Sequence, residues 1–303
     1  MPAGHEVKMN EIRLAQKGET ARQKEIWKLC FGDSDRYIEF YYDNRYREEE
    51  TALLLQDGEI AAMLTMLPVQ AVTAAQRSFN STMLYAIATH PHYRHRGYST
   101  RLTAFAHQHL KNKESAFSVL VPAGKQLFEF YRRQGYQEAF YMREAAWDWS
   151  RIQGWPGGKS APCAIRSVPP QEYNRIREKQ LSGKLHIAYS DEDISYQQKL
   201  SRHTGADIYS LAAAGTQGCV VIERFAGDKV FIKELLMAEE LMPRAVKSIA
   251  QLLPAQEYIL RTPAFLGQQL EGALRPYGML RPNQEIPLDI APKNCGYLGL
   301  AFD

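Results

Sequence analysis

Basic residues and a glycine gather where a β-rich run gives way to a helical period. The segment Thr89–Ser99 reads THPHYRHRGYS and holds Arg94 and Arg96 beside Gly97. The first backbone N–H groups of a helix have no intrahelical partner and form a positive end, and a glycine lets an anion come close to the main chain. The small Ser99 keeps the first helical turn open. The segment therefore predicts a cradle for a diphosphate.

Two motifs, in this order along the chain, resemble those of the GNAT acetyltransferases. Arg94–Ser99 (RHRGYS) is similar to the family's R-x-x-G-x-G/A, with Ser99 where glycine or alanine is usual. Tyr131–Tyr136 (YRRQGY) is similar to the family's Y-x-x-x-G-F/Y. The resemblance implies an N-acetyltransferase that moves acetyl from acetyl-CoA, its cosubstrate, to a primary amine by direct attack, with no metal. It also implies an α+β acyl-CoA N-acyltransferase fold, with a mixed central sheet flanked by helices.

The resemblance implies a cleft in which two strands, Leu84–Thr89 and Phe117–Val121, splay apart to admit the pantetheine arm. Main-chain groups of the first strand would pair with that arm, and the following loop would hold the diphosphate. The residues expected to bind the cosubstrate are Ile87, Ala88, Thr89, Arg94, His95, Arg96, Gly97, Tyr98, Ser99 and Thr100. Tyr131 would lie near the thioester sulfur and protonate the departing thiolate, a task that suits a phenol with an ordinary pKa of about 10.

In this family the first two helices commonly line the acceptor pocket, and here they carry acidic and aromatic side chains. These are Trp27, Phe31, Asp33, Asp35, Glu39, Tyr41 and Tyr42. Such a mixture suits a cationic amine through ion pairing and cation–π contact, so we expect a polyamine, an amino sugar or a peptide amine as the acceptor. For the aromatic run from Tyr37 to Tyr42, packing between domains is an equally good interpretation. For the general base, His90, Glu59 and a water chain remain alternatives.

The second half of the chain repeats, weakly, the order of β-rich and helical periods found in the first. A hairpin is expected at Asp57–Gly58, between two β-rich runs of the first half. We expect an active GNAT domain over 1–148, a Gly/Pro-rich linker over 149–162 and a degenerate copy over 163–303. The duplication resembles the enhanced-intracellular-survival aminoglycoside acetyltransferases without their sterol-carrier-like domain. In that branch the C-terminal carboxylate enters the first active site, a role open here to Asp303.

The second copy is expected to be chemically silent. At the position of the first diphosphate loop it carries Glu239 and Glu240, which would repel phosphate. A helix is expected over Leu266–Leu274, and Leu274 then stands where the first copy has Tyr131. Without a cationic cradle or a phenol, this copy has no apparent means of acyl transfer.

Composition argues against several other classes of function. The 303 residues include 37 Lys and Arg against 34 Asp and Glu, a formal net charge of +3, too balanced to favour nucleic acid or membrane as a partner. The four cysteines form no CxxC pair, and the histidines of Thr89–Ser99 lack a metal-binding spacing. We expect a cytoplasmic protein without export signal or membrane span, acting on a small-molecule amine. A homo-oligomer stays open, as does a catalytically weak acyl-CoA sensor.

Overall fold

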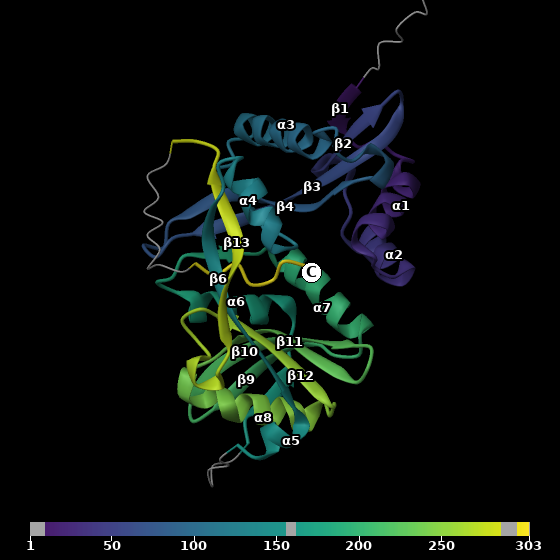
Figure 1. Ribbon diagram of the computed structural model, residues 1–303. Helices are drawn as coiled ribbons and strands as arrows, with labels where there is room; N and C mark the ends of the chain where they lie inside the picture. The colour runs from purple at the N-terminus through teal and green to yellow at the C-terminus, as the bar shows by residue number, and fades with distance from the viewer. Residues whose placement is uncertain (1–9, 156–161, 286–295, 303) are drawn as a thin grey trace, which may run out of the picture. The chain divides into compact units, whose positions relative to one another are not determined.

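The computed structural model describes residues 10–155, 162–285 and 296–302 (Figure 1). The chain divides into two compact units, and both are discontinuous in sequence. Unit 1 comprises Met1–Pro68, Asn80–Leu120 and Arg281–Ile286, and unit 2 comprises Val69–Phe79, Val121–Leu280 and Pro287–Asp303. This division differs from the single boundary expected at 149–162. Residues 156–161 of that expected linker lie outside the described residues.

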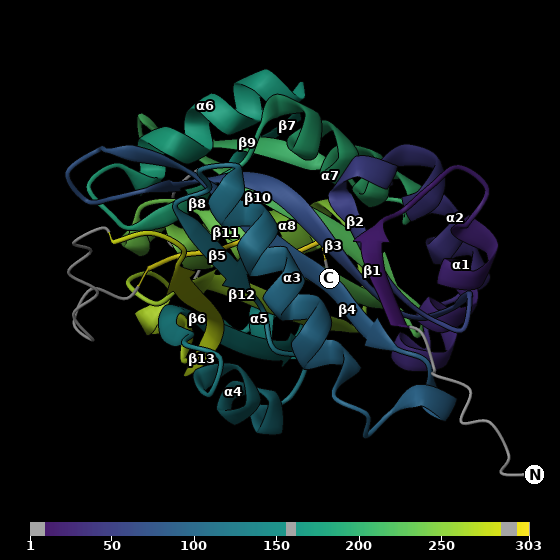
Figure 2. The same cartoon turned by 90° about the horizontal axis from the view of Figure 1, so that it is seen from above.

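Unit 1 carries the diphosphate motif on a five-strand order, β1-β2-β3-β4-β5. Its elements are β1 (Asn10–Leu14), α1 (Thr20–Phe31), α2 (Asp35–Asn44), η1 (Glu48–Glu50), β2 (Thr51–Gln56), β3 (Glu59–Val72), β4 (Ser78–Thr89), η2 (Pro91–Tyr93), α3 (Tyr98–Asn112) and β5 (Phe117–Leu120). Neighbours β1–β2 and β2–β3 are antiparallel, whereas β4 and β5 are parallel. In Figures 1 and 2, α3 lies on the opposite side of the strands from α1 and α2.

The predicted hairpin of unit 1 is confirmed. Gln56 pairs with Glu59 across the turn, and both central residues have positive φ, Asp57 at 53° and Gly58 at 85°. A two-residue turn of this kind matches the twist of the strands and requires residues that tolerate the left-handed region, as Asp-Gly does. The turn fixes the register of β2, and with it the position of Gln56 at the end of that strand.

Unit 2 has the strand order β13-β6-β12-β11-β10-β9-β7. Its elements are α4 (Lys125–Arg132), β6 (Gln137–Asp148), α5 (Trp149–Gln153), β7 (Ala164–Ser167), α6 (Pro170–Leu181), β8 (His186–Ala188), α7 (Asp191–His203), β9 (Ile208–Ala213), β10 (Thr216–Phe225), β11 (Lys229–Leu236), η3 (Glu239–Leu241), α8 (Met242–Leu252), β12 (Glu257–Pro263), η4 (Gln268–Leu270) and β13 (Ala273–Pro282). β11 and β12 are parallel, as are β4 and β5 in unit 1. Figure 1 shows α6 and α7 on one face of these strands and α5 and α8 on the other.

The helix expected over Leu266–Leu274 is wrong. That stretch contains the short η4, and Leu274 belongs to strand β13, where it pairs with Arg143 of β6. Its apolar residues satisfy a helical period, but the ladder that β13 forms with β6 favours extended backbone here. The comparison of Leu274 with Tyr131 therefore has no basis, since Tyr131 stands on helix α4.

Helix α7 was not predicted, although its beginning carries a clear local signal. The Ser190 hydroxyl accepts from the Asp193 N–H, and the Asp193 carboxylate accepts from the Ser190 N–H and hydroxyl. Such a capping box satisfies N–H groups that a helix leaves without partners. With α7 included, the second half runs β7, α6, β8, α7, β9, β10, β11, α8, β12, β13. Apart from the extra β8 and the short η4 in place of α4, this is the order of helices and strands from β1 to β6.

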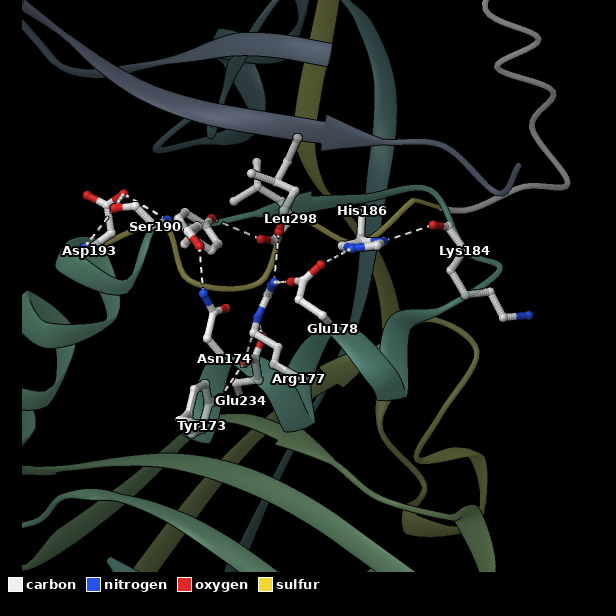
Figure 3. A network of polar contacts seen from close by, with 12 residues as sticks. Tyr173, Asn174, Arg177, Glu178, Lys184, His186, Ser190, Asp193, Glu234 and Leu298 are labelled. Carbon is white, nitrogen blue, oxygen red and sulfur yellow. Dashed lines mark hydrogen bonds and ion pairs between the residues drawn. The ribbon is translucent and has the colours of Figure 1, made fainter. Parts of the chain in front are cut away.

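A buried ion pair joins helix and sheet in unit 2 (Figure 3). Arg177 of α6 lies 3.0 Å from Glu234 of β11, and both side chains have no exposed surface. The Tyr173 hydroxyl donates to the same carboxylate at 2.5 Å, and an Arg177 Nη1 donates to the Ile187 carbonyl at 2.9 Å. Tyr189 donates to the Leu298 carbonyl, which ties the segment 296–302 to this core. The pair thus connects α6, β8, β11 and the end of the chain.

We expect Glu234→Ala to destabilise the protein by about 3–5 kcal/mol, because it removes the buried carboxylate beside Arg177 and leaves the guanidinium only the partly exposed Glu178. Glu172→Ala is the matched control, since its partner Arg166 is 64% exposed. That exposed pair contributes about 1 kcal/mol at most. Urea unfolding followed by circular dichroism measures both variants. Equal, small losses in the two variants would show that the buried pair does not hold the unit together.

Candidate functional site

The edge of β4 opens at the place where the sequence predicts a cleft. β4 pairs with β5 over Ser81–Met83, opposite Phe117–Val119, and within the described residues this pairing goes no further. Beyond Met83, β4 continues to Thr89 and contains Ala86 at φ 48°, a left-handed conformation that interrupts the regular pleat. Polar main-chain groups of Ile87, Ala88 and Thr89 therefore lie on a stretch of β4 without β5 beside it.

The loop after β4 presents a row of backbone donors. His95 and Gly97 have φ values of 63° and 72°, and Gly97 is the N-cap of α3. In the described chain, no acceptor within hydrogen-bond distance serves the N–H groups from His95 to Thr100, and the first helical bond runs from Arg101 N–H to the Gly97 carbonyl at 3.0 Å. Successive N–H groups at a helix N-terminus form an anion site. The loop thus offers a run of backbone donors at the place where the sequence predicts a diphosphate cradle, and the binding of a diphosphate there stays a prediction.

The two arginines of the loop form hydrogen bonds with the protein itself. Arg94 donates from Nε to the Thr89 carbonyl at 3.3 Å and from Nη2 to the Cys30 Sγ at 3.6 Å. Arg96 donates from Nη1 to the Gln56 Oε1 at 2.8 Å, and its guanidinium lies 5.4 Å from the centroid of the Tyr93 ring. Their positive charges stay beside the cradle, while their N–H groups fix the shape of the loop.

The two side-chain candidates for a general base have different surroundings. His90 is buried, and burial, together with nearby Arg22, lowers its pKa, so its ring is mainly neutral at pH 7. Its Nδ1 accepts from the His92 N–H at 3.3 Å, and its Nε2 lies 3.8 Å from Glu25. Glu59 is exposed and accepts from the Tyr93 hydroxyl at 3.0 Å. The His90 lone pair is therefore already engaged within the loop.

Most of the aromatic residues expected to line the acceptor pocket pack together in unit 1. Trp27 and Tyr41 are buried, with ring centroids 4.8 Å apart, and burial raises the pKa of Tyr41 to about 12. Tyr85, next to the irregular residue of β4, packs against Trp27 at 5.7 Å. Sequence reasoning missed Tyr85, although its place on the opened part of β4 is a usable signal. Phe31 is 41% exposed at the end of α1.

The acidic side chains of the same helices already have partners. Asp33 accepts from the Trp27 indole N–H at 2.8 Å. Asp35 forms an exposed ion pair with Lys28 at 2.7 Å, and Glu39 forms one with Lys24. A carboxylate that is paired with lysine attracts an external cation less strongly. The aromatic rings, rather than these three acids, are the better candidates for contacting a cationic acceptor.

Tyr131 lies on α4 and belongs to unit 2, whereas the cradle belongs to unit 1. The side chain is buried, which raises the pKa of its phenol to about 12. Its ring packs edge-on against Tyr136, with centroids 5.7 Å apart. The phenol is thus protonated at every ordinary pH, and its place beside the thioester stays a prediction. Asp303 lies outside the described residues.

Two observations bear on where a ligand could bind. A cavity of ≈ 460 Å³ lies between the start of α1 and the β2–β3 turn, lined by Gly18, Glu19, Ala21, Arg22, Gly58, Glu59 and Ile60. It includes none of the residues expected to bind acetyl-CoA. Over the ranges that the structure covers, no three His, Cys, Asp or Glu side chains come together as a metal site. No helix in those ranges is long and apolar enough to span a membrane.

In the corresponding loop of the second half, a carboxylate is bound by backbone N–H groups of another loop, the one between β12 and β13. Glu239 accepts from the N–H groups of Gly267 at 2.6 Å and of Gln269 at 3.1 Å. Helix α8 then begins with Met242 and Pro243, and a proline has no N–H to offer an anion. These contacts are consistent with the expectation that this half does not catalyse transfer. The loop carries the negative charge of Glu239 at the position where a phosphate would need hydrogen-bond donors.

Comparison with known proteins gives one matching family model, over less than half of the chain, and several solved structures with a similar fold. Residues 11–139 match the family model described as an acetyltransferase (GNAT) domain. A probable N-acyltransferase from Enterococcus faecalis V583 has a similar structure, with a TM-score of 0.71, 16% identity, and 90% of this chain and 73% of that chain covered. A GCN5-related N-acetyltransferase from Anabaena variabilis has a TM-score of 0.72 at 16% identity, covering 95% and 81%. Eis1 from Mycobacterium abscessus has 0.66 at 13%, covering 90% and 74%.

Identities this low show a shared fold and nothing finer. The predicted α+β acyltransferase fold, with a mixed sheet flanked by helices, is confirmed by these structures. No curated protein matches the sequence.

Proposed function

We propose that the chain transfers acetyl from acetyl-CoA to a primary amine by direct attack, because residues 11–139 match the model of a GNAT acetyltransferase domain. The observation that carries the proposal is the row of N–H groups from His95 to Thr100, which have no acceptor in the described chain. A helix N-terminus with Gly97 at its cap and two arginines beside it suits the diphosphate of coenzyme A. The opened stretch of β4 offers main-chain groups to the pantetheine amides.

The residues of the chain contribute alignment and charge stabilisation rather than a covalent intermediate. Main-chain groups of Ile87 to Thr89 orient the thioester, so the amine attacks a fixed carbonyl. A nitrogen–carbon bond forms and the carbon–sulfur bond breaks, the amine gives up one proton to water, and the departing sulfur receives one. Tyr131, kept protonated by its raised pKa, donates that proton or a hydrogen bond at the developing thiolate.

The acceptor proposed is a small cationic amine: a polyamine, an amino sugar or a peptide amine. Support comes from the aromatic surroundings of the opened β4, since Trp27, Tyr37 and Tyr85 lie together there. Rings attract an ammonium group through cation–π contact, by about 0.5–2 kcal/mol each. The second half takes no part in transfer in this proposal.

Thermal melting with acetyl-CoA tests the proposal first. At a ligand concentration about 100 times Kd, binding adds roughly 2.7 kcal/mol of stability, a rise of several degrees in melting temperature. AMP, which lacks both diphosphate and pantetheine, is the control and should give little shift. An amine panel with thiol detection then measures turnover. Binding without turnover on any amine would favour the acyl-CoA sensor, and no shift at such an excess would exclude both.

A further inference from the structure

One amide oxygen holds both sides of the diphosphate loop. Gln56, the last residue of β2, is only 7% exposed. Its Oε1 accepts from the Arg96 Nη1 at 2.8 Å and also from the Tyr98 hydroxyl. Its Nε2 donates to the Asp57 Oδ2 at 3.2 Å, in the β2–β3 turn, which fixes the orientation of the amide. A residue far away in sequence thus joins the strand end to the loop.

The two donors belong to Arg96 and Tyr98, the residues on either side of Gly97. The backbone of Gly97 is in the left-handed region, with φ 72°, and so is that of His95, two residues earlier, with φ 63°. A residue other than glycine is strained in this region, and such conformations persist where the surroundings hold them. Arg96 also stacks over Tyr93, and Tyr98 is buried. The loop backbone is therefore held through the side chains of Arg96 and Tyr98.

We propose that Gln56 is a positioning residue for acetyl-CoA. Through Arg96 and Tyr98 it keeps the N–H groups from His95 to Thr100 convergent before the diphosphate arrives. A loop without this clamp has to be ordered on binding, and that ordering lowers affinity. The effect falls on acetyl-CoA binding and leaves the chemical step alone, because Gln56 touches no reacting atom. The inference rests on the proposed function.

The neutrality of Gln56 also fits this role. A carboxylate at this position could accept the same two bonds, but it would cancel the charge of Arg96 and stand against the Asp57 carboxylate. An amide accepts both bonds and leaves the positive charge of Arg96 effective beside the cradle. Gln56→Glu therefore separates two effects: it keeps the hydrogen bonds that hold the loop, and it changes the charge beside the diphosphate site.

Two measurements on Gln56→Leu test the proposal. We expect the KM for acetyl-CoA to rise about tenfold, as loss of about two ordinary hydrogen bonds predicts, with kcat within about twofold of wild type. NMR order parameters of the backbone of residues 95–100 should fall without any ligand, since the loop loses its clamp. Gln56→Glu should keep high order parameters in this loop but bind acetyl-CoA more weakly, more so at low salt. Gln108→Leu, on the exposed side of α3, should change neither readout.

A double-mutant cycle completes the test. Because Tyr98 acts mainly through Gln56, Tyr98→Phe should weaken binding alone and add little in the Gln56→Leu background. Unchanged order parameters and affinity in Gln56→Leu, or a loss of kcat at unchanged KM, would overturn the proposal while the function stands. If wild-type protein itself fails to bind acetyl-CoA in calorimetry, the proposed function falls and takes the cosubstrate role of Gln56 with it. The order parameters then decide only whether Gln56 holds the turn.

Discussion

Replacement of Tyr131 by phenylalanine is expected to lower kcat by about 10²- to 10³-fold, the usual contribution of a positioned general acid. Affinity for acetyl-CoA should stay within about twofold, because the cradle belongs to the loop before α3 and not to α4. The buried phenol keeps its proton, since burial raises its pKa to about 12. Phenylalanine preserves the ring that packs against Tyr136 and removes only the hydroxyl. Steady-state kinetics and calorimetry on the same preparation separate the two effects.

Tyr136→Phe is the matched control for this variant. Tyr136 is buried beside Tyr131, and the family motif accepts either phenylalanine or tyrosine at this position. We expect its kcat to remain near that of wild type. A similar loss in both variants would show that packing of the ring pair matters, rather than the Tyr131 proton. Full activity of Tyr131→Phe would remove the phenol from the mechanism.

The pH profile follows from the direction of the Tyr131 shift. A raised pKa keeps the phenol neutral and able to donate below about pH 12, so its deprotonation removes no activity in the ordinary range. The attacking amine, in contrast, must lose its proton, so kcat/KM rises with pH toward the pKa of the acceptor. We expect no falling limb between pH 8 and pH 10, a range that lies about two units or more below the shifted pKa. A decline there that Tyr131→Phe abolishes would contradict the shift.

A carboxylate at Ser99 should abolish cosubstrate binding without harming the fold. Ser99 lies in the first turn of α3, among the N–H groups expected to hold the diphosphate. An aspartate there is favourable to the helix itself, by about 0.3–1 kcal/mol. Against a diphosphate, however, charges about 4–5 Å apart repel by several kcal/mol at an effective dielectric constant of about 20. We expect Ser99→Asp to weaken acetyl-CoA binding about 100-fold or more, with an unchanged or higher melting temperature.

Ser99→Asn distinguishes charge from size at this position. It has nearly the shape of aspartate but no charge, so it should weaken binding by about tenfold at most. Calorimetry at two salt concentrations measures both variants, and the penalty of the aspartate should shrink at high salt. Equal losses for asparagine and aspartate would mean that bulk alone obstructs the site. Normal binding by Ser99→Asp would place the diphosphate elsewhere.

Local signals predicted the parts of the site that depend on local geometry. The glycine-arginine segment begins a helix as expected, with Gly97 at the cap, and Asp57–Gly58 forms the expected hairpin turn. Both follow from backbone preferences of a few neighbouring residues. The capping box at Ser190 was equally local, so α7 could have been found from the sequence.

Contacts between distant residues could not be predicted in the same way. Periodicity suggested a helix at Leu274, but pairing with Arg143, far earlier in the chain, makes it a strand. Composition suggested free acids near the acceptor, whereas Lys28 and Lys24 already pair with Asp35 and Glu39. The clamp by Gln56 depends on a strand end meeting a loop forty residues later in sequence. Such partners are set by tertiary structure, and no short pattern encodes them.

A crystal structure of the protein with acetyl-CoA tests the central claim most directly. We expect diphosphate oxygens within about 2.7–3.2 Å of backbone nitrogens between His95 and Thr100, at hydrogen-bonding angles. We also expect Arg96 to stay bonded to Gln56 in the complex. A diphosphate held by side chains alone while these nitrogens remain without acceptors, or one bound at the loop beside Glu239, would contradict it.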